Sequence, residues 1–199
     1  MSGLAAHAPV AWYLARAAGL VSFGLLTLSV WLGLGMSTRL ATRFQKRLFG
    51  WHQTLVWTGL SMLGLHAGSL LFDPTLHFRL PSVLVPFASP WRPGIVAAGV
   101  VAGWLTLMLA VSFRLRKWIG QKGWRRLHYA SFLAFVLALG HALTAGSDLK
   151  GVSGQVLAAL AAGPVVWLVF YRALAPRQER AKPARHLRPS ADSPAAAPS

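Results

Sequence analysis

Apolar residues gather into five long runs that are separated by short polar or basic segments. Each run holds about 20 residues or more, and a helix of that length, rising about 1.5 Å per residue, crosses the roughly 30 Å hydrocarbon layer of a bilayer. We therefore predict five transmembrane helices, at residues 10–36, 51–72, 94–113, 127–146 and 152–171. The fold class that follows is all-α, an integral membrane bundle of about five helices.

The segments outside these helices divide the chain into three parts. Residues 1–9 form a short extracytoplasmic N-terminus, residues 10–174 the membrane domain, and residues 175–199 a cytoplasmic tail whose Ala, Pro, Arg and Ser content is typical of disorder. Residues 73–93 form the longest connection and contain five prolines. The N-terminus lacks the basic start of a removable signal peptide, so we expect the first helix to remain in the mature protein.

Charge is sparse and almost entirely positive. The chain is 55% hydrophobic and 12% charged, with a formal net charge of +16. Sixteen of its 20 Lys and Arg residues lie in segments 37–50, 114–126 and 172–199. The positive-inside rule then places these segments in the cytoplasm and the N-terminus outside, as expected for a multi-pass protein of the plasma membrane. This distribution explains the excess of positive charge without a nucleic-acid partner.

Histidine is the metal-binding residue type that the predicted helices contain. The four acidic residues all lie outside them, and the chain has no cysteine. The absence of cysteine excludes disulfides, cysteine-ligated iron–sulfur clusters and covalently attached haem. Any haem would therefore have to be held non-covalently.

Four histidines occupy two of the predicted helices at matched depths. His52 and His66 are 14 positions apart, and His128 and His141 are 13 positions apart. Each separation corresponds to about 20 Å along a helix, and both helices run from inside to outside. Neutral imidazole is a good iron ligand, and ionisable residues inside membrane spans are usually functional. The pattern predicts two b-type haems stacked across the membrane, each held by two histidines.

The helical geometry of the fourth span does not fit this arrangement without a distortion. At about 100° per residue, His66 returns to within roughly 40° of His52, whereas His141 is about 140° away from His128. We therefore predict that this helix bends or bulges, with a π-bulge at Gly140 as the expected place.

Two other interpretations of the four histidines remain open. They could be core residues satisfied by hydrogen bonds, or they could form a metal or proton pathway of a transporter. The transporter interpretation is weaker because no Asp or Glu lies within any predicted span to share the charge of a cation.

The two spacings, His-x13-His and His-x12-His, resemble those of the ferric reductase-like transmembrane domain, as does the segment WRRLHY at residues 124–129. This family includes NADPH oxidases, ferric reductases and the bacterial haem subunit MsrQ, and the similarity covers about residues 10–172. The resemblance implies an inner haem held by His52 and His128 and an outer haem held by His66 and His141. It also implies electron transfer from the cytoplasm to an extracytoplasmic acceptor, either ferric iron or a partner oxidoreductase.

The segment Leu14-Ala15-Arg16-Ala17 also resembles a segment of the oxidases whose arginine lies near the outer haem. By this resemblance Arg16 would contact a haem propionate or the electron acceptor. The alternative is an interfacial arginine whose charged group reaches the headgroup region.

Two features depart from the oxidases. Leu70 stands where superoxide-producing members have a further histidine, so the resemblance does not extend to oxygen reduction. No Gly-x-Gly-x-x-Gly segment follows the last span, so the chain needs a partner that supplies electrons. We expect a cytoplasmic reductase carrying FAD or FMN, or quinol, as the donor. An exported reductase is a possible acceptor, as for an MsrQ-like subunit, and the chain would then be the membrane haem subunit of an oxidoreductase.

Further aromatic and basic residues are candidates for supporting roles. Trp57, Phe132 and Phe135 lie at intermediate depths, where they would shorten the path between the haems or simply pack. The candidates for pairing with haem propionates are Arg43, Arg47, Arg125 and Arg126 on the inner side, and Arg79 and Arg92 on the outer side. The sequence does not choose among them.

Overall fold

The computed structural model describes residues 2–37, 43–74, 76–146 and 149–174, with side chains described from Val10 onward. These residues form α1 (Ser2–Ser37), α2 (Gln45–Leu70), α3 (Leu80–Leu84), α4 (Pro93–Ser112), α5 (Arg116–His128), α6 (Ala130–Ala145) and α7 (Val152–Leu174). The predicted all-α architecture is confirmed, and each of the five predicted spans overlaps a long helix. The predicted tail at residues 175–199 lies outside the described part of the chain.

Four helical segments among the described residues are long and apolar enough to cross a membrane. They are Val10–Ser37, Pro93–Ser112, Arg116–Ala145 and Val152–Leu174, so α5 and α6 together count as one. The helix α2 has sufficient length, with 26 residues, but it is not among the four. Its polar residues, including Lys46, Gln53 and the two histidines, lower its hydropathy.

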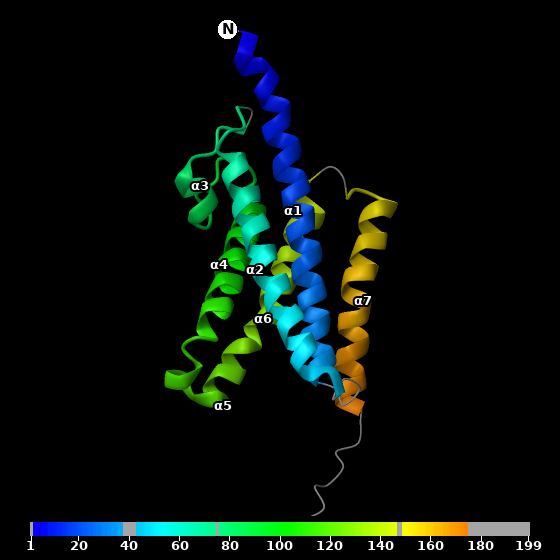
Figure 1. Cartoon of the computed structure of the whole chain (residues 1–199). Coiled ribbons are helices and arrows are strands. Elements are labelled where there is room, and N and C mark those ends of the chain that lie inside the picture. Colours follow the sequence, from blue (N-terminus) through cyan, green and yellow to red (C-terminus); the bar gives the residue numbers. More distant parts are fainter. Residues whose placement is uncertain (1, 38–42, 75, 147–148, 175–199) are drawn as a thin grey trace, which may run out of the picture.

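The long helices lie side by side (Figure 1). The most extensive packing joins α1 to α2 and α4 to α6, while α7 lies against α1. The helices α1, α4 and α7 run from the end of the molecule near α3 to the opposite end, and α2 and α6 return. The two histidine-bearing helices therefore run in the same direction, as the sequence predicts.

Close packing of α1 on α2 depends on small and hydroxyl-bearing side chains. Gly59 is buried, and a Cβ atom there would lie 2.9 Å from two atoms of Leu26 on α1. The hydroxyl of Ser22 donates a hydrogen bond of 2.8 Å to the carbonyl of Gly59. Such contacts are typical of helix pairs in membranes, where small residues let two backbones approach each other.

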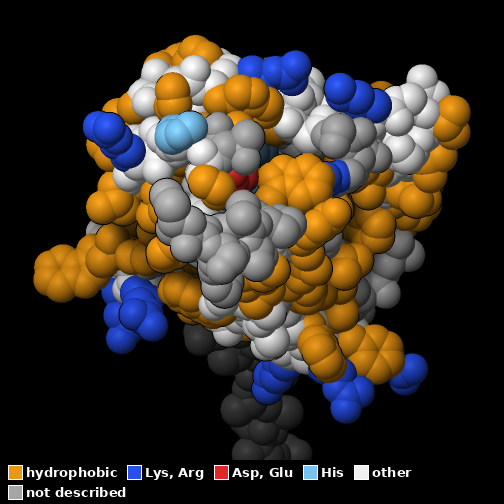
Figure 2. Space-filling model, turned by 90° about the horizontal axis from the view of Figure 1, so that it is seen from above, with side chains coloured by type: hydrophobic (Ala, Val, Ile, Leu, Met, Phe, Trp, Pro, Cys, Tyr) orange, Lys and Arg blue, Asp and Glu red, His pale blue; other side chains and the backbone are white. Residues whose placement is uncertain are grey.

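The outward faces of the helices are apolar, as expected for contact with lipid. Large hydrophobic side chains on α7 are among the exposed ones, including Leu160, Trp167 and Phe170. Viewed from the end that bears α3, hydrophobic side chains cover much of the flanks, while Lys and Arg side chains lie around the rim (Figure 2).

One expectation about the connecting segments was wrong. Residues 114–126, predicted as a basic loop, lie largely in α5, which is kinked at Gly120, where φ is 77° and ψ is 157°. Lys, Arg and Gln have high helix propensity, so the segment is helical although it lacks an apolar stripe. The 73–93 segment is the longest connection, as predicted, and contains the short helix α3; α1 begins at Ser2, before the predicted start of the first span at residue 10.

Candidate paired-histidine site

Four histidines of the helical bundle lie together as two pairs. The ring centroids of His52 on α2 and His128 on α5 are 6.3 Å apart, and those of His66 on α2 and His141 on α6 are 6.4 Å apart. Two imidazoles on opposite sides of one metal ion have ring centres about 6.2 Å apart, if each metal–nitrogen bond is about 2 Å and each ring nitrogen lies about 1.1 Å from its ring centre. The predicted partners thus lie side by side at a centroid spacing that a shared metal ion would allow.

A break between α5 and α6 brings both fourth-span histidines toward α2. The N–H of Tyr129 bonds to the carbonyl of Arg126, and the N–H of Phe132 bonds to that of Tyr129, so the helix is tightened to i→i−3 bonds at this point. Such a turn advances about 120° per residue instead of about 100° and also redirects the axis. The predicted distortion is confirmed, but its predicted place is wrong, because Gly140 lies within the continuous helix α6.

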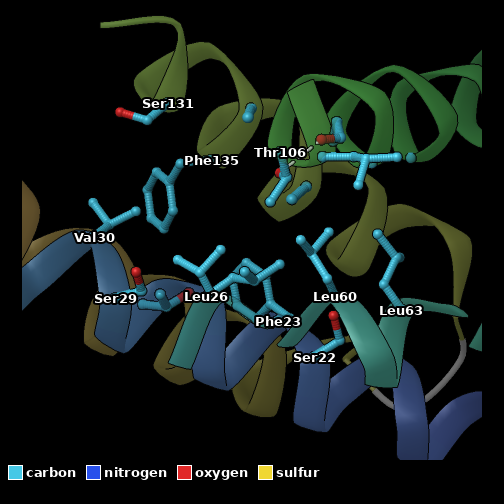
Figure 3. A pocket seen from close by; sticks show the side chains of 18 of the residues that line it. Ser22, Phe23, Leu26, Ser29, Val30, Leu60, Leu63, Thr106, Ser131 and Phe135 are labelled. Carbon is cyan, nitrogen blue, oxygen red and sulfur yellow. Dashed lines mark hydrogen bonds between the residues drawn. The ribbon is translucent and has the colours of Figure 1, made fainter. Parts of the chain in front are cut away.

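The histidines line one large cavity between α1, α2, α4 and α6. Its volume is about 1670 Å³, and its walls include all four imidazoles. This exceeds the range of about 300–1,000 Å³ that is usual for a single small-molecule site. Figure 3 shows Phe23, Leu26, Leu60 and Phe135 among the side chains that line it, together with a few hydroxyl-bearing residues. The walls between the two histidine levels are therefore largely apolar.

Backbone carbonyls of neighbouring helices hold three of the imidazoles. In each case Nδ1–H can donate to a carbonyl: His52 to Ser29 over 2.9 Å, where the Ser29 hydroxyl also lies 2.9 Å from Nδ1, His66 to Ala15 over 2.7 Å, and His141 to Ile95 over 2.8 Å. With Nδ1 engaged, Nε2 is the nitrogen that remains available to a metal. Metal-ligating histidines usually donate their second nitrogen to a carboxylate, carbonyl or water in this way.

His128 is held differently. Its Nδ1 is buried and has no hydrogen-bond partner in the described part of the chain. Its ring stacks instead on Trp124, with centroids 4.9 Å apart and planes 26° apart. The indole Nε1 of Trp124 is also buried without such a partner.

These residues fit a haem at each level. At each level two imidazoles would hold one iron, the cavity is large and mainly apolar, and at three of the four histidines the Nδ1 bond would leave Nε2 for the metal. No group of three or more His, Cys, Asp or Glu residues lies close enough to hold a metal ion, as far as the described residues go. Each pair therefore offers two protein ligands, and iron bound by a porphyrin has two coordination positions that the porphyrin does not fill.

Arg16 lies close to the pair formed by His66 and His141. It is half-buried, lines the cavity, and directly follows the residue whose carbonyl accepts the bond from His66. Its guanidinium carbon is 3.9 Å from the ring centre of Trp12, a cation–π contact. This position is consistent with either interpretation of Arg16 given above.

The structure separates the other candidate arginines. Arg92 lines the cavity and donates a hydrogen bond of 2.8 Å to the carbonyl of Thr144 at the end of α6, whereas Arg79 is exposed and does not line the cavity. On the inner side, Arg125 lines the cavity, while the exposed residues Arg43, Arg47 and Arg126 do not. Arg172, which was not a candidate, also lines it.

Among the aromatic candidates, Phe135 is the one that lies in the buried core of the bundle. It is buried and stacks on Phe23 of α1, with centroids 6.3 Å apart. Phe132 packs against this core. Trp57 is 44% exposed and lies at the edge of the bundle.

Comparison of the chain with protein-family models, curated proteins and solved structures finds no match, so its assignment depends on the residues described above.

Proposed function

We propose that this protein is a membrane haem b electron-transfer subunit of the ferric reductase-like type. His52 and His128 would bind one haem, and His66 and His141 the other. When bound, the two haems would supply one-electron redox chemistry at two depths of the membrane. The observation that carries the proposal is the approach of both predicted pairs to 6.3 Å and 6.4 Å between ring centroids.

Saturated axial ligation favours electron transfer over ligand chemistry. A haem with two histidines has no vacant axial position at which oxygen or a substrate would bind iron. The cavity near the outer pair is bordered by Leu70, which offers no further ligand. Reduction of an external acceptor, either ferric iron or an exported oxidoreductase, is therefore the proposed activity.

We further propose that the chain crosses the membrane five times and that its C-terminus lies in the cytoplasm. The helix α2 is included as a crossing because it packs along α1 and carries two of the ligands. Basic residues are frequent at the end of the bundle opposite α3, where α5 and the last turn of α7 lie, including Arg114, Arg116, Lys117 and Arg172. The positive-inside rule assigns this end to the cytoplasm of a plasma membrane. A soluble flavoprotein with FAD or FMN, or quinol, would deliver electrons there.

A metal or proton transporter is less well supported. A bare transition-metal site generally has four or more ligands, whereas each level offers two histidines. The described helices contain no Asp or Glu to accompany a transported cation.

The test is an absorption spectrum of the purified protein combined with a haem assay. We expect a Soret band, sharp α and β bands after reduction, and about two haems per chain. His66→Ala should remove one haem and leave the other. His77→Ala, in an exposed loop, is the control and should keep both. A colourless protein that takes up no added haem would contradict the proposal and favour the transporter.

A further inference from the structure

We propose that Gly19 and Gly99 are positioning residues that expose the carbonyl oxygens which orient His66 and His141. The inference rests on the proposed function, because it concerns the orientation of haem ligands. It assigns a role to residues that have no side chain and that do not touch the metal.

The same arrangement occurs at all three hydrogen-bonded histidines. The carbonyl acceptors are Ala15, Ser29 and Ile95, and the residue four positions after each acceptor is Gly19, Gly33 and Gly99, respectively. Glycine accounts for 19 of 199 residues, about one in ten, so three glycines at three such positions are not expected from composition alone.

Helix geometry explains the spacing of four. In an α-helix the Cα–Cβ bond tilts toward the N-terminus, so a side chain covers the turn that precedes its own Cα atom. The side chain at position i+4 therefore lies over the carbonyl at position i. That carbonyl already accepts the N–H of residue i+4, but its second lone pair remains available. Glycine at i+4 leaves the oxygen accessible to an imidazole from a neighbouring helix.

The glycines Gly19 and Gly99 lie closer to their imidazoles than Gly33 lies to His52. A Cβ atom on Gly19 would lie 2.8 Å from Nδ1 of His66, and one on Gly99 would lie 2.8 Å from Nδ1 of His141. A Cβ atom on Gly33 would lie 3.5 Å from Cε1 of His52, which is an ordinary van der Waals contact. Both outer ligands would have to move if a methyl group were added, whereas the inner ligand would not.

The difference between the levels defines the experiment. We would purify Gly19→Ala, Gly99→Ala, Gly33→Ala and Gly24→Ala variants and measure the haem-to-protein ratio and the low-temperature EPR spectrum. Gly24 is an exposed glycine of α1 with open space around it, so its variant controls for the change in helix propensity. EPR reports the orientation of the two axial imidazoles, which a general packing role would not alter selectively.

We expect Gly19→Ala and Gly99→Ala to change the EPR signal of one haem and to weaken its retention about 10- to 100-fold, the usual effect of disturbing the partner of a metal-bound histidine. The second haem should stay and report that the bundle is folded. Gly33→Ala and Gly24→Ala should match the wild type.

Three results would overturn the inference: wild-type spectra for both outer-level variants, equal damage from Gly33→Ala, or failure of both outer-level variants to accumulate as folded protein. Each would assign these glycines to general packing or to no role. Absence of haem from the wild type would instead refute the proposed function, so the two failures are distinguishable.

Discussion

Trp124 stacks on His128 with ring centroids 4.9 Å apart and planes 26° apart, and this contact replaces the hydrogen bond that orients the other three histidines. Both residues lie on α5, four positions apart, so one helical turn provides the ligand and its support. The inner pair is therefore asymmetric, since His52 is held by a carbonyl of α1 while His128 is held by its own helix.

Removing this stacking should affect the inner haem alone. An aromatic pair contributes about 0.5–1.5 kcal/mol beyond its buried area, so Trp124→Ala should weaken haem binding at His128 by roughly 2- to 12-fold. Trp124→Phe keeps an aromatic face and should bind both haems normally. Haem titration followed by the Soret band measures this, and equal losses in the two variants would contradict the role of stacking.

Overpacking at Gly59 should separate α1 from α2. Gly59→Leu places a large side chain where a Cβ atom alone would lie 2.9 Å from Leu26. Forcing extra volume into a packed interface typically costs about 1–3 kcal/mol. We expect a lower midpoint in a denaturation series in mixed detergent micelles. Gly50→Leu, at an exposed glycine of the same helix with open space around it, is the matched control. An unchanged midpoint for Gly59→Leu would show that the helices are not closely packed there.

A hydrogen bond links α1 to α7 near the proline of α7. The indole Nε1–H of Trp31 donates to the carbonyl of Ala161 over 3.2 Å, three residues before Pro164. Trp31→Phe keeps most of the packing but loses the donor, so it should lower stability by about 0.5–1.5 kcal/mol. Trp167→Phe, at a 59% exposed position on α7, should change stability little. Equal effects of the two changes would mean that the bond contributes nothing measurable.

The long helices could be predicted because their apolar runs are unmistakable, and the histidine pairs because matched spacings on two helices of the same direction place their levels together. The helix α5 was missed because its residues favour helix by propensity and not by apolar periodicity. The distortion was predicted at Gly140 but lies at Tyr129, and this place could not be read from the sequence because no glycine or proline marks it.

The supports of the histidines had a weaker signal in the sequence. A backbone carbonyl has no residue identity, so Ala15, Ser29 and Ile95 could not be recognised as acceptors in advance. The stacking of Trp124 on His128 had a usable signal, because positions four apart on a helix are neighbours.

The two interpretations of Arg16 differ in their effect on the outer haem. If its charge acts on the cavity near His66, then Arg16→Gln removes a positive charge that favours the reduced state. The reduction potential of one haem should then fall by an energy on the order of 1 kcal/mol, which is about 40 mV for one electron. Arg79→Gln, at an exposed arginine that does not line the cavity, should leave both potentials unchanged. A spectroelectrochemical titration resolves the two haems. Equal potentials in wild type and Arg16→Gln would identify Arg16 as an interfacial arginine held by Trp12.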